Sequence, residues 1–286
     1  MTLMAASADS SEAARTGPHD ISILVVGDLE GDEFRDVPAA FEVLAPNPRL
    51  FVASCPREAE AWLERGEAPA CIVVAQAYPG QYSSEAVGRL WSRAPLSRLV
   101  ALLGSWCEGE ARSGQPWPGA LRVYWHQWSA RAPRCLAQLA AGRCGPWTLP
   151  PTATDEERWA ADVGGAEGPK LVGLVAIHTP HAAMAEWLSD ACRRIGCATV
   201  WAGPCRPAHI AGARAALFDA TDLGHREAEQ LARFASRVAP APVIALIDFP
   251  RFEDWRRAER CGAAAVLSKP TSVEDLWWQL RRLRGT

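Results

Sequence analysis

The chain lacks any long hydrophobic run. None of its 286 residues lies in a stretch that approaches the roughly 20 apolar residues of a membrane-spanning helix, and the start, MTLMAASADSSEAARTGPHD, has no apolar core of signal-peptide length. It also lacks a large excess of charge of either sign, because 30 basic residues face 33 acidic ones. We therefore expect a cytoplasmic protein that binds neither nucleic acid nor a membrane surface.

The motifs of the common enzyme sites are also missing. The nine cysteines include no C-x-x-C pair or metal-type spacing, and no G-x-S-x-G, dinucleotide-binding or P-loop motif occurs. His178 and His181 stand three residues apart, but Pro180 lies between them and the pattern offers no third zinc ligand. The sequence therefore predicts reduced thiols, no metal or other cofactor, and no enzymatic activity.

Length and composition divide the chain into two domains of ordinary size. Residues 1–20 are small, polar and without a period, which predicts a disordered tail. Residues 145–169 are rich in Pro, Thr, acidic residues and Gly, a composition typical of an interdomain linker. The predicted domains are residues 21–144 and 170–286.

The second half alternates apolar runs with helical periods. Continuous apolar strands between amphipathic helices are typical of a parallel sheet covered on both faces. The fold class is therefore α/β and doubly wound, with any site at the carboxyl ends of the strands. Ser272 can cap the last helix while Asp275 closes a capping box. Strands are expected at 171–177, 198–202, 215–220, 242–247 and 264–268, and helices at 181–196, 225–238, 251–262 and after Ser272.

The first half repeats this rhythm. Superimposing the ends of the third strands puts Ala75 over Asp219, an offset of 144 residues, and superimposing the fifth puts His126 over Lys269, an offset of 143. An offset this steady predicts a tandem repeat of one fold. Strands are expected at 21–26, 49–54, 70–77, 98–105 and 121–128, and helices at 56–66 and 84–93.

Three segments of the second half carry a family resemblance. AALFDATDLG, APVIALIDF and CGAAAVLSKPTSVEDL, in this order and spacing, resemble strands three, four and five of the response-regulator receiver (CheY-like) domain. The resemblance implies two tandem flavodoxin-like domains of five parallel strands with helices on both faces. It also implies a pocket in which an aspartate accepts a phosphoryl group. An acidic pair there holds Mg²⁺, a Thr or Ser senses the phosphate and a lysine neutralises it, since anion must approach anion.

Carried over by position, only part of this pocket remains in the second copy. Asp219 matches the phosphoryl acceptor, and Lys269, followed by Pro270, matches the lysine. The positions of the acidic pair and of the strand-four hydroxyl hold no carboxylate and no hydroxyl. They are occupied by Ile177, His178 and Ile247.

The first copy departs further from the family pattern. Ala75 stands at the acceptor position, His126 at the lysine position and Leu103 at the strand-four position. Asp28 is the one remnant of the acidic pair. Phosphorylation of this copy would have no carboxylate to modify.

Asp219 allows two interpretations. It could accept phosphate, or it could pair with Lys269 and hold strands three and five together. The loss of the metal ligands favours the pairing, so we predict a non-catalytic tandem pseudo-receiver that acts as an interaction or regulatory module in two-component-type signalling. One alternative is a phosphate-accepting receiver that uses Asp219 with unconventional Mg²⁺ binding. Another is a small-molecule sensor or an enzyme that uses the crevice at the strand ends.

The last helix carries a candidate interface. Trp277 and Trp278 cannot both lie on its core stripe, and the resemblance implies that helix four, strand five and helix five form a dimerisation face. A displaced tryptophan would then mark a homodimer or a protein partner such as a histidine kinase. Alternatively it packs on the neighbouring domain or on Trp147 or Trp159. Since the sequence stops at Thr286, just after this helix, we expect any response to pass through another protein.

Overall fold

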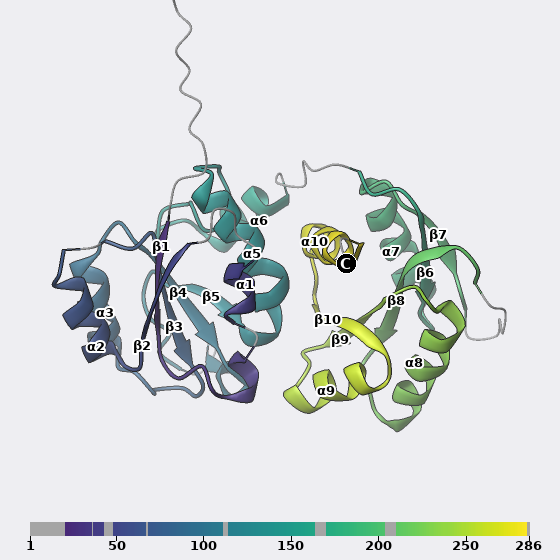
Figure 1. Cartoon of the computed structure of the whole chain (residues 1–286), viewed down its shortest axis with the longest axis horizontal. Helices are drawn as coiled ribbons and strands as arrows, with labels where there is room; N and C mark the ends of the chain where they lie inside the picture. Colours follow the sequence, from purple (N-terminus) through teal and green to yellow (C-terminus); the bar gives the residue numbers. More distant parts are fainter. Residues whose placement is uncertain are drawn as a thin grey trace, which may run out of the picture.

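Ten parallel strands form two separate five-stranded sheets (Figure 1). The computed structural model describes residues 21–35, 37–42, 48–66, 68–110, 114–163, 170–203 and 210–284. The predicted tail, 1–20, lies outside these ranges. The strands of the first sheet are β1 (Ser22–Val26), β2 (Arg49–Ala53), β3 (Cys71–Gln76), β4 (Arg98–Leu103) and β5 (Leu121–Tyr124), and those of the second are β6 (Leu174–His178), β7 (Ala198–Trp201), β8 (Ala213–Ala220), β9 (Val243–Asp248) and β10 (Ala263–Lys269).

The two sheets have the same strand order. The first runs β2-β1-β3-β4-β5, and the second, read from its opposite edge, runs β7-β6-β8-β9-β10. Every pairing is parallel, and this 2-1-3-4-5 order is that of flavodoxin-like domains. The predicted fold class, two tandem flavodoxin-like sheets, is confirmed.

Helices cover both faces of each sheet because strand residues alternate between two apolar layers. In the first domain one layer packs against α1 and α5 and the other against α2 and α3. In the second domain the layers pack against α7 and α10 and against α8 and α9. The helices are η1 (Asp32–Phe34), α1 (Ala39–Glu42), α2 (Pro56–Leu63), α3 (Ser84–Arg93), η2 (Ser105–Cys107), α5 (Trp125–Ala140), α6 (Asp155–Val163), α7 (Ala182–Arg194), α8 (His225–Val238), α9 (Phe252–Arg260) and α10 (Val273–Arg284).

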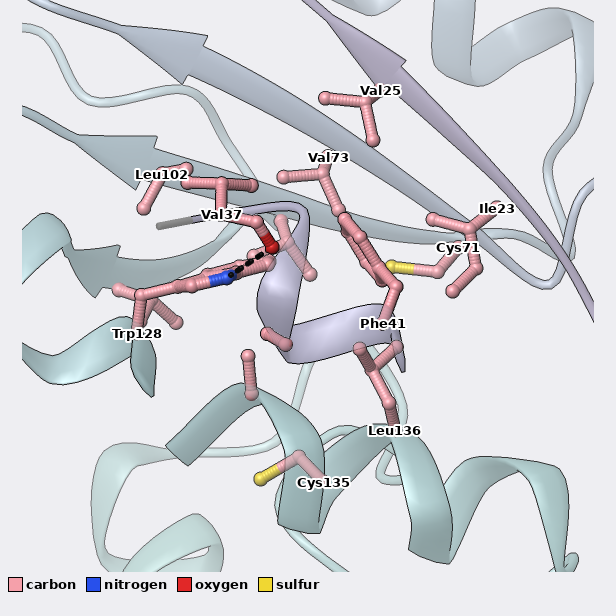
Figure 2. Close-up of a cluster of buried hydrophobic side chains, with 14 of the residues drawn as sticks. Ile23, Val25, Val37, Phe41, Cys71, Val73, Leu102, Trp128, Cys135 and Leu136 are labelled. Carbon is pink, nitrogen blue, oxygen red and sulfur yellow. Dashed lines mark hydrogen bonds between the residues drawn. The ribbon is translucent and has the colours of Figure 1, made fainter. Parts of the chain in front are cut away.

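Figure 2 shows the layer of the first domain that lies under α1 and α5. Trp128 of α5 is fully buried beside Phe41 of α1, with ring centroids 5.9 Å apart in an edge-to-face arrangement. Its indole Nε1 donates a 3.3 Å hydrogen bond to the carbonyl oxygen of Val37. The polar end of this large side chain is therefore satisfied inside the core, as burial of a tryptophan requires.

One predicted element is wrong. The expected strand 121–128 ends at Tyr124, and the helix α5 begins at Trp125. The aromatic residues of this stretch favour a strand by local propensity, but Trp125 and Trp128 point from the helix into the core of the first domain. Tertiary packing therefore overrides the local preference.

The interval predicted as a linker is partly helical and packed. Trp147 is buried in the core of the first domain, with its ring 6.1 Å from that of Trp128. The helix α6 follows, and Asp162 on it is buried. Residues 145–163 therefore belong to the packed structure and extend the first domain towards the second.

Helix α10 lies between the two domains (Figure 1). It contacts α5 and α6 on one side and α7, β8 and β10 of its own domain on the other. Ala130 of α5 is part of the core layer that contains Trp277. The ring of Trp125 lies 5.6 Å from that of Trp255 on α9. The face formed by α9, β10 and α10 is thus packed against the first domain.

A buried ion-pair cluster crosses this seam. Arg134 of α5 donates 3.2 Å and 2.9 Å hydrogen bonds to the carboxylates of Asp162 and Asp275. Arg131 lies 3.4 Å from the other oxygen of Asp275. The Ser272 hydroxyl accepts from the Asp275 backbone N–H at 3.0 Å, so the predicted cap is confirmed, while the Asp275 carboxylate binds the first domain.

Among the described residues, no helix has the length and apolar character needed to span a membrane.

Candidate functional site

Three charged side chains meet at the carboxyl end of the second sheet. Lys269, the last residue of β10, places its Nζ 2.7 Å from Oδ1 of Asp219 on β8 and 3.1 Å from Oδ1 of Asp248 on β9. Asp219 and Lys269 follow Leu217 and Leu267 by two residues, so all four lie on the α7/α10 side of the sheet. The structure thus brings together the two charged residues that the sequence singled out.

The second oxygen of Asp219 is bonded to a residue that the sequence analysis missed. Thr179, which follows β6, donates from its Oγ1 to Asp219 Oδ2 at 2.7 Å. The hydroxyl in turn accepts from the His181 backbone N–H at 3.1 Å, and the Thr179 carbonyl accepts from Trp201 Nε1 at 3.1 Å. Asp219 is only 5% exposed, and both of its oxygens are engaged by side chains of the chain itself.

The remaining predicted pocket residues do not gather around Asp219. Ile177 is buried in the layer below it, while Ile247 is buried in the layer on the opposite face, against α8 and α9. His178 also points to that opposite face. Its ring stacks on Phe218 with centroids 4.9 Å apart, and its Nδ1 lies 3.0 Å from the Ala202 carbonyl oxygen. Burial lowers the pKa of His178.

The face on which a side chain lies explains why Asp248, rather than Ile247, reaches the lysine. In the sheet register, Lys269 is paired with Asp248, and Ile247 is paired with Ser268. Successive strand residues point to opposite faces, so Asp248 is the residue of β9 that shares the face of Asp219 and Lys269. The carboxylate at the end of β9, and not the side chain of Ile247, therefore lies beside the lysine.

At this edge of the sheet, two carboxylates share one lysine ammonium group. One ammonium group, Lys269, lies between two carboxylates, Asp219 and Asp248, and the hydroxyl of Thr179 completes the set. Within the described ranges, no group of three or more His, Cys, Asp or Glu side chains is placed to hold a metal ion. The site can hold strands β8, β9 and β10 together through charge-assisted hydrogen bonds.

The corresponding edge of the first domain is closed by backbone contact. Ala75 of β3 is buried, and Gly27, which follows β1 with φ of +123°, lies so close that an added Cβ would be 2.7 Å from the Ala75 carbonyl oxygen. Leu103 is buried on the other face. Asp28 is exposed, and its Oδ1 accepts from the Glu30 backbone N–H at 2.8 Å. No two of the predicted first-copy residues form a charged pair in the described structure.

His126 does not stand at the strand end. It is the second residue of α5, and the register of β5 places Trp125 immediately after the residue paired with Leu103. His126 is buried, stacks on Tyr124, and lies 3.7 Å from Oε1 of Glu108. Burial lowers its pKa from 6.5 to about 4, so the imidazole is neutral at physiological pH.

A cavity of about 930 Å³ opens beside the strand-end cluster of the second domain. Asp248 and Lys269 line one part of it, and side chains of α6, α7 and the first turn of α10 line the rest. Neither Ile177 nor Ile247 lines it. The crevice that this fold places at the strand ends is therefore open here rather than filled by isoleucine.

Trp277 lies in the core rather than on a free surface. It is buried in the α7/α10 layer, its ring stands 6.5 Å from that of Trp278, and the guanidinium of Arg281 lies 5.3 Å above it. Trp278 is half-buried and packs against the same layer. Both tryptophans of α10 therefore pack within the chain, and the buried Trp277 does not form an exposed interface.

No protein-family model and no curated protein matches the chain. Solved structures similar to it include a protein of Burkholderia pseudomallei described as related to pilus assembly, 15% identical over 39% of this chain and 89% of that one, with a TM-score of 0.35. The E. coli RcsC carboxyl-terminal part, with its linker region and phosphoreceiver domain, is 13% identical over 92% of both chains, with a TM-score of 0.34. A protein described as a two-component response regulator with a GGDEF domain is 12% identical over 92% of this chain and 97% of that one, with a TM-score of 0.32. The fold assignment depends on the strand order of the two sheets, not on these similarities.

Proposed function

We propose that this chain is a cytoplasmic, non-catalytic tandem pseudo-receiver that acts as a protein-interaction or regulatory module in two-component-type signalling. The observation that carries the proposal is the state of Asp219. Its carboxylate is buried, one oxygen is paired with Lys269, and the other accepts the Thr179 hydroxyl. A phosphoryl acceptor must present an oxygen to the donor molecule, and here the carboxylate is 5% exposed with each oxygen hydrogen-bonded within the chain.

Electrostatics support the same conclusion. The carboxylates of Asp219 and Asp248 already share the one ammonium of Lys269, so the cluster carries a net negative charge. A phosphoryl group on Asp219 would add further negative charge at contact distance. Each pair of like charges roughly 4 Å apart costs on the order of 4 kcal/mol near a protein surface, so transfer requires a divalent cation. The β6 end supplies the neutral Thr179 in place of a metal-binding carboxylate.

The first domain supports a role that needs no phosphate. Its acceptor position is Ala75, a buried residue with no carboxylate to modify. A domain without an acceptor can contribute only surfaces. We infer that it serves to present and to brace the second domain.

The packing of α9, β10 and α10 restricts how a partner can bind. In this chain the first domain covers that face through α5, so a homodimer through the same face would require the two domains to separate. We therefore propose that a protein partner, a histidine kinase or another signalling protein, binds a surface outside this seam.

Phosphorylation is the direct test. The chain is incubated with acetyl phosphate and Mg²⁺ and its intact mass is measured, with a phosphate-accepting receiver treated in parallel as the positive control. We expect the control to gain one phosphoryl group and this chain to gain none. A stable gain of one phosphoryl group that disappears in Asp219→Ala would instead establish a phosphate-accepting receiver with unconventional Mg²⁺ binding.

A further inference from the structure

The cavity of about 930 Å³ lies between α7 and α10, with Trp159 of α6 on one side. Met184 and Trp187 of α7 and Val273 of α10 form its walls, and Asp248 and Lys269 stand at the strand end. Ligand pockets for small molecules have volumes of roughly 300–1,000 Å³ and mostly apolar walls. Its size and its lining are therefore those of a binding pocket.

Three large aromatic side chains stand exposed around this cavity. Trp159 is 60% exposed, Trp187 40% and Phe249 62%. Exposed apolar surface that gathers around a concave site marks a binding site rather than the scattered apolar residues of an ordinary surface. The tryptophan faces also carry the negative quadrupole that attracts cations.

Phe249 provides an independent indication. Its φ of +41° lies in the left-handed region, which a bulky residue adopts only at a cost of roughly 1–3 kcal/mol. Such strain persists where the surrounding structure imposes it, and it concentrates at ligand sites. Here it holds an exposed aromatic ring at the cavity, directly after Asp248.

One carboxyl group of the cavity lacks a hydrogen-bond donor within the described structure. Glu274 is 2% exposed, and its Oε1 has no hydrogen-bond partner within the described structure. Burial raises the pKa of this carboxyl group. Asp248 is 44% exposed on its side chain and pairs with Lys269 through Oδ1. A ligand that donates hydrogen bonds or carries positive charge would satisfy both carboxyl groups.

The local charge favours a cation. Asp248 and Glu274 line the cavity together with two cationic side chains, Lys269 and Arg194. The charged groups near Glu274 are Asp162, Arg134 and Arg194. Lys269 is already shared by Asp219 and Asp248, and Arg194, in the last turn of α7, interacts with Glu274. An anionic ligand would gain only Arg194 and would meet the carboxylates.

We propose that this cavity binds a small organic amine, whose ammonium group is held by Asp248 and Glu274 and whose apolar body lies against Trp187 and Trp159. The proposal goes beyond the interaction role and does not depend on it, because it does not involve phosphorylation of Asp219. It gives the chain a site for a chemical input.

The test uses three matched probes that differ only in their polar end: phenethylamine, phenethyl alcohol and hydrocinnamate. Each is titrated into the full chain, and binding is followed by calorimetry and tryptophan fluorescence. We expect saturable binding of the amine in the millimolar range or tighter, with the alcohol about 10-fold weaker and hydrocinnamate weaker still. Tighter binding of hydrocinnamate, equal binding of amine and alcohol, or no saturation by any probe would each overturn the proposal.

Substitutions locate the site. Asp248→Asn is expected to weaken the amine about 5- to 10-fold and to leave the alcohol unchanged, because only the amine uses the charge. Trp187→Ala should weaken both, and Trp106→Ala, which removes an exposed tryptophan of the first domain, should weaken neither. Glu274→Gln repeats the test at the second carboxyl group. If Asp248→Asn and Glu274→Gln both bind the amine as the natural chain does, the assignment is wrong.

Discussion

The Arg134→Met substitution tests what holds the two domains together. Arg134 and Asp275 have side chains only 6% exposed, and Asp162 lies on the other side of the guanidinium. Methionine keeps much of the apolar length of arginine but removes the charge. Two buried carboxylates then lose their main partner, and Asp275 keeps only the 3.4 Å contact with Arg131.

The expected loss is about 3–5 kcal/mol of unfolding free energy, the cost of leaving a buried charge uncompensated. Urea unfolding followed by tryptophan fluorescence and by circular dichroism measures it. Arg93→Met is the matched control. Arg93 pairs with the exposed Glu64 and lies 3.6 Å from Glu60, which keeps Arg89 as a partner, so its loss should cost at most about 1 kcal/mol. Adding Asp162→Asn and Asp275→Asn to Arg134→Met removes the unpaired charges and should restore most of the loss. Equal effects of Arg134→Met and Arg93→Met would refute the account of the seam.

Two further predictions concern buried polar groups. The pKa of His126 is lowered from 6.5 to about 4, so the unfolded chain binds more protons and the free energy of unfolding decreases as pH falls from 6.5 towards 4. His126→Phe should remove up to about 3 kcal/mol of that loss in acid-dependent unfolding, whereas His225→Phe, at an exposed site, should not. Equal pH profiles for all three chains would contradict the assignment. In the strand-end cluster, Thr179→Val should lower the free energy of unfolding in urea by about 1–3 kcal/mol, because Asp219 loses a hydrogen bond. Lys269→Met should lower it by about 3–5 kcal/mol, because the charge of Asp219 is left unpaired. No loss in either variant would show that the cluster does not stabilise the sheet.

The meeting of Asp219 and Lys269 could be predicted because parallel strands end at one edge of a sheet, so residues at the ends of β8 and β10 must come together. Thr179 was missed for a chemical reason. The family pattern has metal-holding carboxylates at this strand end, and a hydroxyl one residue further on does not fit that pattern. Its role becomes visible only when both oxygens of Asp219 are traced to their donors.

The position of α10 could not be derived from its own sequence. A helix with one apolar stripe leaves its other side for solvent, and the adjacent residues Trp277 and Trp278 therefore predict a candidate interface. In the structure the second side is covered by α5 and α6 of the other half of the chain. Contacts between segments more than 100 residues apart in sequence leave no periodic signal, and for the same reason the Arg134–Asp275 pair was not predicted.

Helix α10 connects the strand ends of the second domain to the seam between the two domains. Lys269 ends β10, and the first turn of α10 a few residues later carries both Glu274, on the cavity, and Asp275, on Arg134. A displacement of that turn by a bound molecule cannot leave the salt-bridged seam unchanged. Occupancy of the second domain would then be transmitted as a change in how firmly the first domain is held, with no phosphate needed as the messenger.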